Sequence, residues 1–314
     1  MKGNVFNFFI EIINTFFGQV NKKALKRVII MNFRTDLAIE RREVSPHTDD
    51  GLKVDEYTVN NAKITKIEVL NKTGERAIKK PKGNYITIET KKLDTGALVD
   101  KDLAKVIAEE LVKILPDGEA LVCGIGNGEI TPDALGPDCV SHILATRHIG
   151  EELARSIGFD NLRSVTAISP GVLGQTGIET GEIIKAIIDK TKPDFVIAVD
   201  ALASRKLSRL GKTVQISDTG IIPGGGIANS RNELSKKTLG VPVISIGVPT
   251  VVDANTLVND IAENEIEYKG AGDMIVTPKE IDLLIERSAR LISHSLNCAL
   301  QPDIDEDSLL MLTD

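Results

Sequence analysis

The sequence predicts an α/β fold with a mostly parallel sheet, helices on both faces, and a small N-terminal antiparallel β region. After about residue 96, apolar runs rich in β-branched residues alternate with segments of helical periodicity, as parallel strands and their crossover helices do. Between residues 52 and 90 the runs alternate polar and apolar residues and are separated by turn sequences, which is typical of antiparallel strands with one wet face. The 314 residues, 42% of them hydrophobic, can bury a large core.

The expected elements begin with antiparallel strands at 64–69 and 85–89. The apolar spacing of 103–115 then predicts a helix, which Pro116-Asp117-Gly118 ends. Further strands are expected at 120–124, 164–169, 195–200, 213–217 and 241–246, and further helices at 134–148, 177–190, 251–266 and 278–300.

Both ends of the chain are expected to lie outside the core. Residues 31 to about 48 are polar and charged without sustained periodicity, which predicts an exposed arm. The acidic segment 303–307 predicts a solvated tail. The apolar stretch 5–17 is too short to span a bilayer. Residues 1–30 are interpreted either as an amphipathic helix or as an extension without function before a start at Met31.

Composition and charge argue against several classes of function. A formal net charge of −7 disfavours a generally basic surface for nucleic acid. Cys123, Cys139 and Cys298 are an odd number without CxxC spacing, so we expect neither a disulfide framework nor a zinc site. A reducing cytoplasm fits this cysteine usage. The expected partner is therefore a peptide or a small molecule, with no membrane and no direct nucleic-acid contact.

Two aspartates follow predicted strands, where parallel sheets place catalytic groups. Asp133 opens a helical segment after the turn at 124–128, and Asp200 ends the apolar run 195–199. Two carboxyls in one crevice repel each other, so near neutral pH the pair can hold a single proton. The ionised acid then deprotonates a water while the protonated acid polarises a peptide carbonyl. In the simpler interpretation, Asp133 caps a helix and Asp200 bonds to backbone amides.

The expected roles of the two aspartates follow from position. A helix dipole favours the anion of Asp133, which makes it the provisional base and Asp200 the acid. The roles are exchangeable because a coupled pair titrates as a unit. Asp218 and Asn127 are supporting candidates. Asp218 begins an Asp-Thr-Gly triplet like that of pepsin-like proteases, but those enzymes are all-β and pair two such triplets, so a turn is the simpler explanation.

Glycine-rich loops follow two other predicted strands. Glycine lets backbone amides approach a substrate or an oxyanion, although tight turns explain these loops equally well. The candidate substrate contacts are Gly171, Gly174, Gly224, Gly225 and Gly226.

A nucleotide or nicotinamide site at the glycines of 124–128 is the alternative from another functional class. Their G-x-G-x-G spacing departs from the dinucleotide fingerprint, and Pro132 interrupts the expected helix start. Neither His142 nor His148 belongs to an HExxH pattern. We therefore expect no metal and no cofactor.

Several stretches, in order along the chain, resemble one known family. They include RTDLA at 34–38, GIGN at 124–127, TPDALGP at 131–137, DALA at 200–203, QISDTG at 215–220 and GVPTVVDA at 247–254. These stretches resemble the germination proteases of spore-forming bacteria, endopeptidases that degrade small acid-soluble spore proteins. The resemblance implies essential aspartates at Asp133 and Asp200. It also implies a homo-oligomer, tetrameric in the family, that is located in the forespore and spore core.

The resemblance also implies a precursor that trims its own N-terminus. In the family's substrates the cut follows an acidic residue and precedes an apolar residue and then Ala, and Thr35-Asp36-Leu37-Ala38 has that order. We expect cleavage between Asp36 and Leu37. The fold is also similar to that of hydrogenase maturation endopeptidases, but no histidine here matches their third metal ligand. A spore-protein binder without catalytic activity is the remaining alternative.

On this resemblance the chain divides into five segments. These are an extension at 1–30, a propeptide arm at 31–36, a β-containing region at 37–95, an α/β catalytic domain at 96–300 and an acidic tail at 301–314.

Overall fold

The computed structural model describes residues 34–313 except 46–49, 92, 94–95, 157, 160, 226–231 and 263–273. The described residues belong to one compact unit. Residues 1–30 and Met31, with their predicted roles, lie outside the described residues.

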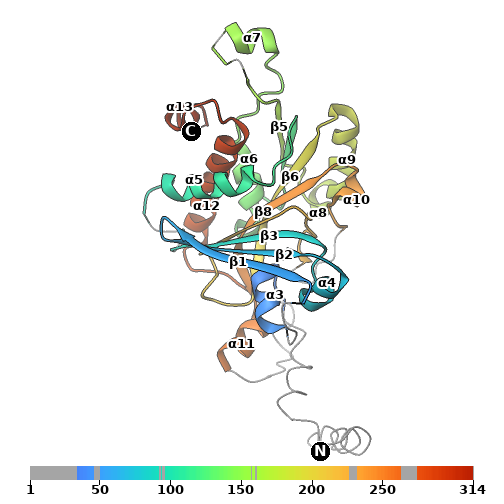
Figure 1. Ribbon diagram of the computed structural model, residues 1–314, viewed down its shortest axis with the longest axis vertical. Helices are drawn as coiled ribbons and strands as arrows, with labels where there is room; N and C mark the ends of the chain where they lie inside the picture. Colours follow the sequence, from blue (N-terminus) through green and yellow to red (C-terminus); the bar gives the residue numbers. More distant parts are fainter. Residues whose placement is uncertain are drawn as a thin grey trace, which may run out of the picture. The chain divides into compact units, whose positions relative to one another are not determined.

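One sheet runs through the described part of the chain, in the order β1-β2-β3-β7-β8-β6-β4-β5, with β9 paired to β8 (Figure 1). Its strands are β1 (Leu52–Val59), β2 (Ala62–Val69), β3 (Gly83–Glu89), β4 (Ala120–Gly124), β5 (Val165–Ile168), β6 (Phe195–Ser204), β7 (Thr213–Ser217), β8 (Val243–Asp253) and β9 (Ile275–Val276). Strands β5, β4, β6 and β8 are parallel, and all other pairs are antiparallel. The α/β fold class with a parallel core is confirmed.

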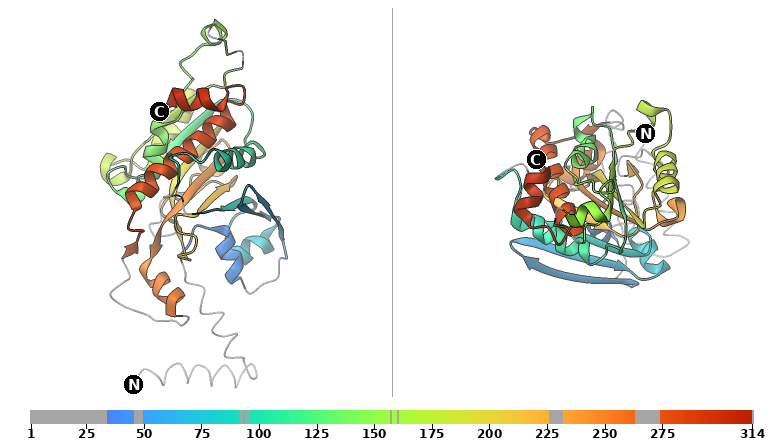
Figure 2. Two further views of the ribbon diagram at one scale, coloured as in Figure 1. Left: turned by 90° about the vertical axis from the view of Figure 1, so that its left-hand side faces the viewer. Right: turned by 90° about the horizontal axis from the view of Figure 1, so that it is seen from above.

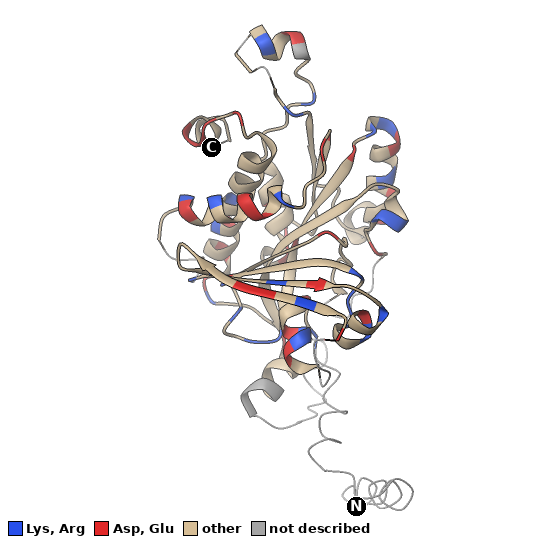
Figure 3. Cartoon of the chain, viewed as in Figure 1, with Lys and Arg blue, Asp and Glu red and all other residues tan. Residues whose placement is uncertain are grey.

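The antiparallel strands extend the same sheet instead of forming a separate appendage. β3 pairs with β7, with Tyr85 opposite Ser217. β1 and β2 form a hairpin closed by Asn60 and Asn61, whose φ values of 47° and 64° suit a two-residue hairpin turn. The edge strand β1 carries acidic and basic residues along its length (Figure 3), which discourages pairing with other chains.

Helices cover both faces of the parallel core. They are α3 (Ala38–Val44), α4 (Lys72–Ile78), α5 (Lys101–Val112), the 3₁₀ helix η2 (Thr131–Asp133), α6 (Leu135–Ser141), α7 (Glu151–Ser156), α8 (Leu173–Thr176), α9 (Thr180–Thr191), α10 (Lys236–Leu239), α11 (Ala254–Ala262), α12 (Ile281–Leu300) and α13 (Glu306–Thr313). Helices α12 and α9 lie on opposite sides of the sheet (Figure 2).

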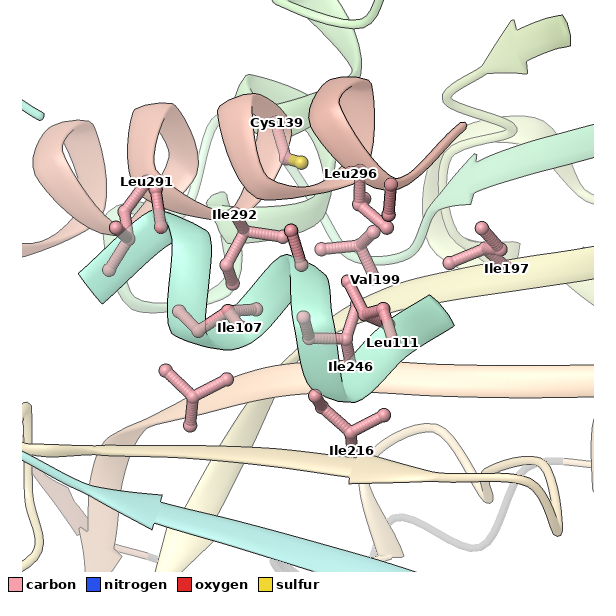
Figure 4. Close-up of a cluster of buried hydrophobic side chains, with 14 of the residues drawn as sticks. Ile107, Leu111, Cys139, Ile197, Val199, Ile216, Ile246, Leu291, Ile292 and Leu296 are labelled. Carbon is pink, nitrogen blue, oxygen red and sulfur yellow. The ribbon is translucent and has the colours of Figure 1, made fainter. Parts of the chain in front are cut away.

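The side chains of β6 separate these two faces. Ile197 and Val199 pack with Ile107 of α5 and Ile292 of α12 (Figure 4), whereas Val196 and Ala198 belong to the cluster under α9. Because successive side chains of a strand point to opposite faces, the face of every other β6 residue follows from these clusters.

Several expected elements differ from the observed ones. The strand expected at 195–200 continues to Ser204, so Asp200 lies within β6 and not at its end. The helix expected at 134–148 is shorter, since Thr131-Pro132-Asp133 forms a 3₁₀ turn and α6 ends at Ser141. The helix expected from 251 begins at Ala254, because the buried strand β8 continues to Asp253. The acidic tail includes helix α13, whose Leu309 is fully buried. Among the described residues no helix is long and apolar enough to cross a membrane.

The described part of the expected exposed arm is packed into the protein. Thr35, Leu37, Ala38 and Glu40 are all buried, with at most 2% of their surface exposed. The prediction of exposure is wrong here because the polar side chains are satisfied by residues far away in the sequence, which a local pattern does not contain. Glu40 accepts hydrogen bonds from the backbone N–H groups of Arg205 and Lys206 at 2.6 and 2.9 Å, so its charge is compensated without water.

Candidate active site

Asp133 and Asp200 lie at the same level of the parallel sheet. β4 ends at Gly124, which pairs with Val199, and the N–H of Ile125 donates to the Val199 carbonyl at 2.8 Å. Asp200 is the next residue of β6. The chain leaving β4 turns into η2, which ends at Asp133 and contacts both β6 and β8. The sheet therefore brings the two segments that carry these aspartates together.

The turn after β4 holds the Asp133 carboxylate. The backbone N–H of Asn127 donates to Asp133 Oδ2 at 2.8 Å, a bond that stabilises negative charge. Gly126 makes the turn possible, since its φ is +120° and a Cβ there would lie 2.0 Å from the carbonyl oxygen of Asp133. Because the protein's own carboxylate takes the Asn127 N–H, this turn is poorly suited to a pyrophosphate.

The side chain of Asn127 links this turn to the first glycine-rich loop. Its Oδ1 accepts hydrogen bonds from Gln175 Nε2 at 2.7 Å and from the N–H of Glu129 at 3.0 Å. Gly171, with a φ of +72°, and Gly174, in α8, belong to the loop that carries Gln175. The loop containing both predicted glycines thus adjoins the turn that holds Asp133.

Asp200 is 3% exposed and lies on the face of the sheet under α9, as its position two residues after Ala198 requires. It pairs with Gly247 of β8, which in turn pairs with Gln215 of β7. A Cβ on Gly247 would lie 2.2 Å from the Asp200 carbonyl oxygen. Neighbouring strands lie about 4.8 Å apart, so the backbones of Asp200 and Gln215 are about 10 Å apart, with Gly247 between them.

The bond expected to be cleaved is held between β6 and β7. The N–H of Asp36 donates to the Ala203 carbonyl at 2.9 Å, and the N–H of Ala203 donates to Asp36 Oδ2 at 2.8 Å. Gln215 Nε2 donates to the Asp36 carbonyl at 3.0 Å, while its Oε1 accepts from the N–H of Ala38 at 2.6 Å. Gln215 thus fixes both sides of the Asp36–Leu37 peptide.

Gln215 is not among the site residues predicted from the sequence. Its signal is a glutamine between the apolar residues of a predicted strand. In Thr213-Val214-Gln215-Ile216-Ser217 all five residues are buried. A buried glutamine on the polar face of such a strand needs hydrogen-bond partners, which marks it as a candidate for binding backbone.

Helix α3 is bound to the loop that follows β6 through its acidic residues Glu40 and Glu43. Arg209 pairs with Glu43 at 2.5 Å and with Glu89 at 2.9 Å. Burial opposes ionisation of Glu43, but hydrogen bonds from Arg209 and Lys206 outweigh it and lower the pKa of Glu43 to about 2. Helix α3 therefore has anchors in addition to its contacts with the residues before Leu37.

A cavity of about 220 Å³ lies beside Asp36, on the same face of the sheet as Asp200. The arm, the end of α4, strands β3, β7 and β8, and the second glycine-rich loop line it. Gly224 lies in that loop, and a Cβ on Gly225 would be 3.6 Å from Asp36 Oδ1. Gly226 lies outside the described residues.

The Asp218 carboxylate makes two hydrogen bonds with Asn84. Its Oδ1 accepts from the N–H of Asn84 at 2.7 Å and its Oδ2 from the Asn84 side chain at 2.6 Å. The cavity lining includes Thr219 and Gly220 but not Asp218. Within the described ranges, no three His, Cys, Asp or Glu residues are grouped to hold a metal ion.

Comparison with known proteins identifies the family. The germination protease family model matches residues 33–271. The germination protease of Caldanaerobacter subterraneus is 44% identical over 91% of this chain and 99% of its own, and that of Clostridium acetobutylicum is 42% identical over 87% and 96%. A solved hydrogenase maturation protease from Thermococcus kodakarensis is 19% identical and covers 61% of this chain and 98% of its own, with a TM-score of 0.36. The resemblance of the sequence motifs is confirmed, and the chain belongs to the germination protease family of peptidases.

Proposed function

We propose that this peptidase hydrolyses small acid-soluble spore proteins, using Asp133 and Asp200 to activate water, and that it cleaves its own precursor between Asp36 and Leu37. The observation that supports the proposal most strongly is the seating of the Asp36–Leu37 peptide by Gln215. That residue lies in register with Asp200 across Gly247, on the face that carries the Asp200 side chain. A peptide carbonyl and a buried carboxyl thus share one region of the sheet.

The proposed reaction needs one ionised and one protonated carboxyl. The ionised carboxylate, provisionally Asp133, takes a proton from water as the water oxygen attacks the carbonyl carbon. The protonated carboxyl, provisionally Asp200, hydrogen-bonds to the carbonyl oxygen as it gains negative charge. Gln215 Nε2 already donates to the same oxygen of Asp36 and supports that charge. Collapse of the tetrahedral intermediate breaks the C–N bond, and a proton passes to the leaving nitrogen.

The test compares cleavage of a purified small acid-soluble spore protein by wild type, Asp133→Asn and Asp200→Asn, with folding matched by circular dichroism. Each variant should lose about three orders of magnitude or more in kcat, as when a group acting in the transition state is removed. Asp189→Asn, an exposed residue of α9, is the matched control and should cut at the wild-type rate. If either active-site variant stays near the wild-type rate, that aspartate is structural. If wild type leaves the spore protein intact, the substrate assignment fails.

The remaining proposals follow from family membership. The protein is proposed to be a homo-oligomer in the forespore and spore core, with no cofactor. Light scattering at micromolar concentration tests the assembly, and a monomeric mass would refute it.

A further inference from the structure

The cavity beside Asp36 carries an excess of positive charge. Among its described lining residues, Arg41, Lys79 and Lys80 are cationic and Glu233 is the acid besides Asp36. The carboxylate of Asp36 faces this cluster while its Oδ2 accepts the Ala203 N–H. The protein thus holds one of its own acidic side chains, next to the bond expected to be cut, at a cationic cavity.

Lys80 is the cation that the rest of the structure explains least. Within the described part of the chain it has no hydrogen bond or ion pair, whereas Arg41 donates to the Thr35 carbonyl at 3.2 Å. Burial lowers the pKa of Lys80, the charge of Asp36 acts in the opposite direction, and Arg41 lowers it further. Lys80 is partly buried, and an ammonium partly removed from water without a fixed partner is stabilised when an anion approaches it.

The backbone around Lys80 is held in place to present this side chain. Lys79 ends α4 in the left-handed conformation, with a φ of 53°, which turns the chain at this point. The Pro81 carbonyl accepts a hydrogen bond from Tyr85 Oη at 2.9 Å, and Tyr85 accepts one from Thr219 Oγ1 at 3.0 Å. Lys80 is therefore positioned by contacts with β3 and with the residues after β7.

We propose that Lys80 is a specificity-determining residue, which with Arg41 selects an acidic side chain immediately before the cleaved bond, and that Asp36 occupies this subsite in the precursor. The inference rests on the proposed function and assigns the subsite to named residues. A substrate residue bound here takes the place of Asp36, so its backbone N–H can donate to the Ala203 carbonyl and its carbonyl can accept from Gln215 Nε2, as those of Asp36 do.

The test measures kcat/KM on peptides that differ only in Glu or Gln before the cleaved bond. In Lys80→Met, which keeps the side-chain length and removes the charge, kcat/KM for the Glu peptide should fall about 10–100-fold while that for the Gln peptide changes little, as expected for a lost charge-assisted contact. Lys80→Glu should favour a peptide with Lys at that position. Lys82→Met, an exposed neighbour, is the control and should keep wild-type discrimination.

The outcomes separate the two proposals. If wild type cuts neither peptide nor spore protein, the proposed function fails. If wild type cuts and Lys80→Met keeps the Glu preference, the subsite assignment fails. A second readout does not need catalysis. In the full chain carrying Asp200→Asn, which stays uncleaved, the shifts in melting temperature from Asp36→Asn, Lys80→Met and both changes should be non-additive, because each change removes the same electrostatic interaction. Additive shifts would contradict the pairing.

Discussion

The parallel and antiparallel halves of the sheet contribute different parts of the candidate site. In the parallel half, β4 and β6 bring Asp133 and Asp200 to one level of the sheet. In the antiparallel half, β7 supplies Gln215, which donates to the Asp36 carbonyl. The turn before β3 supplies Lys80, which lines the same cavity as the Asp36 side chain. β8 joins the halves through Gly247. Under the proposed function, bond cleavage and substrate recognition fall on separate elements, which substitutions can perturb separately.

The largest effect is expected from Gly126→Ala in the parallel half. A Cβ would meet the Asp133 carbonyl oxygen at 2.0 Å, and the φ of +120° strains any other residue. We expect kcat to fall about 100-fold or more from misplacement of the carboxylate, with a stability loss of roughly 1–3 kcal/mol. Gly150→Ala, where a Cβ meets nothing within 4 Å, serves as the control. A wild-type kcat in Gly126→Ala would show that the turn does not position Asp133.

The next effect concerns the antiparallel half. Gln215→Met leaves the Asp36 carbonyl and the Ala38 N–H without their partner, at a cost of about 1–3 kcal/mol for each unsatisfied group. Self-cleavage of the full chain, followed by gel electrophoresis over time, should slow about 10–100-fold. An unchanged rate would mean that the seated peptide is not the one cut.

The contacts of α3 predict a pH dependence of stability. The pKa of Glu43 is lowered from 4.5 to about 2 in the folded protein, so its ionised form stabilises the fold above about pH 4.5 and this contribution is lost as the pH falls towards 2. In urea unfolding, the free energy of unfolding of wild type should fall by about 1–3 kcal/mol more over this interval than that of Glu43→Gln, after allowance for solvent screening. Parallel curves for the two proteins would contradict the assignment. Glu109→Gln, on the exposed face of α5, is the control.

The smallest effect is expected far from both parts of the site. Lys185 and Asp189 form an exposed ion pair one turn apart on α9, at 3.0 Å. Because Lys185 also donates to the Leu239 carbonyl at 3.2 Å, the pair is tested from its other side. Asp189→Ala should change the free energy of unfolding by no more than about 0.5 kcal/mol and leave kcat unchanged. A larger loss of activity would extend the site to α9 and remove the distinction between the two halves.

The sequence predicts strands in both halves of the sheet, and the expected 120–124 and 213–217 have the bounds of β4 and β7. The strands around Val122 and Ile197 are continuous apolar runs, so their positions follow from local pattern. The burial of residues 35–40 could not be predicted locally, because Glu40 is satisfied by amides of Arg205 and Lys206 more than 160 residues away. The cavity could not be predicted for the same reason, since Lys80 meets Asp36 only in the folded chain.

The two predicted aspartates fall at neighbouring places because β4 and β6 pair in parallel. Asp200 lies within β6, next to the Val199 that pairs with the end of β4, and Asp133 ends η2 after β4. Asp218 directly follows β7, and its carboxylate is bound to the backbone N–H and the side chain of Asn84. The Asp133 carboxylate also accepts a hydrogen bond, from the backbone N–H of Asn127. Position near the end of an apolar run therefore identifies candidate carboxylates, and the proposed substitutions test which of them take part in the reaction.

The most direct test of the account is the intact mass of the full chain over time, for wild type and for Asp200→Asn. The account predicts that wild type loses residues 1–36 and acquires Leu37 as its N-terminus, while Asp200→Asn remains whole. A new terminus at another residue, or cleavage of Asp200→Asn at the wild-type rate, would contradict the claim that the seated Asp36–Leu37 bond is cut by a carboxyl on the same face of the sheet.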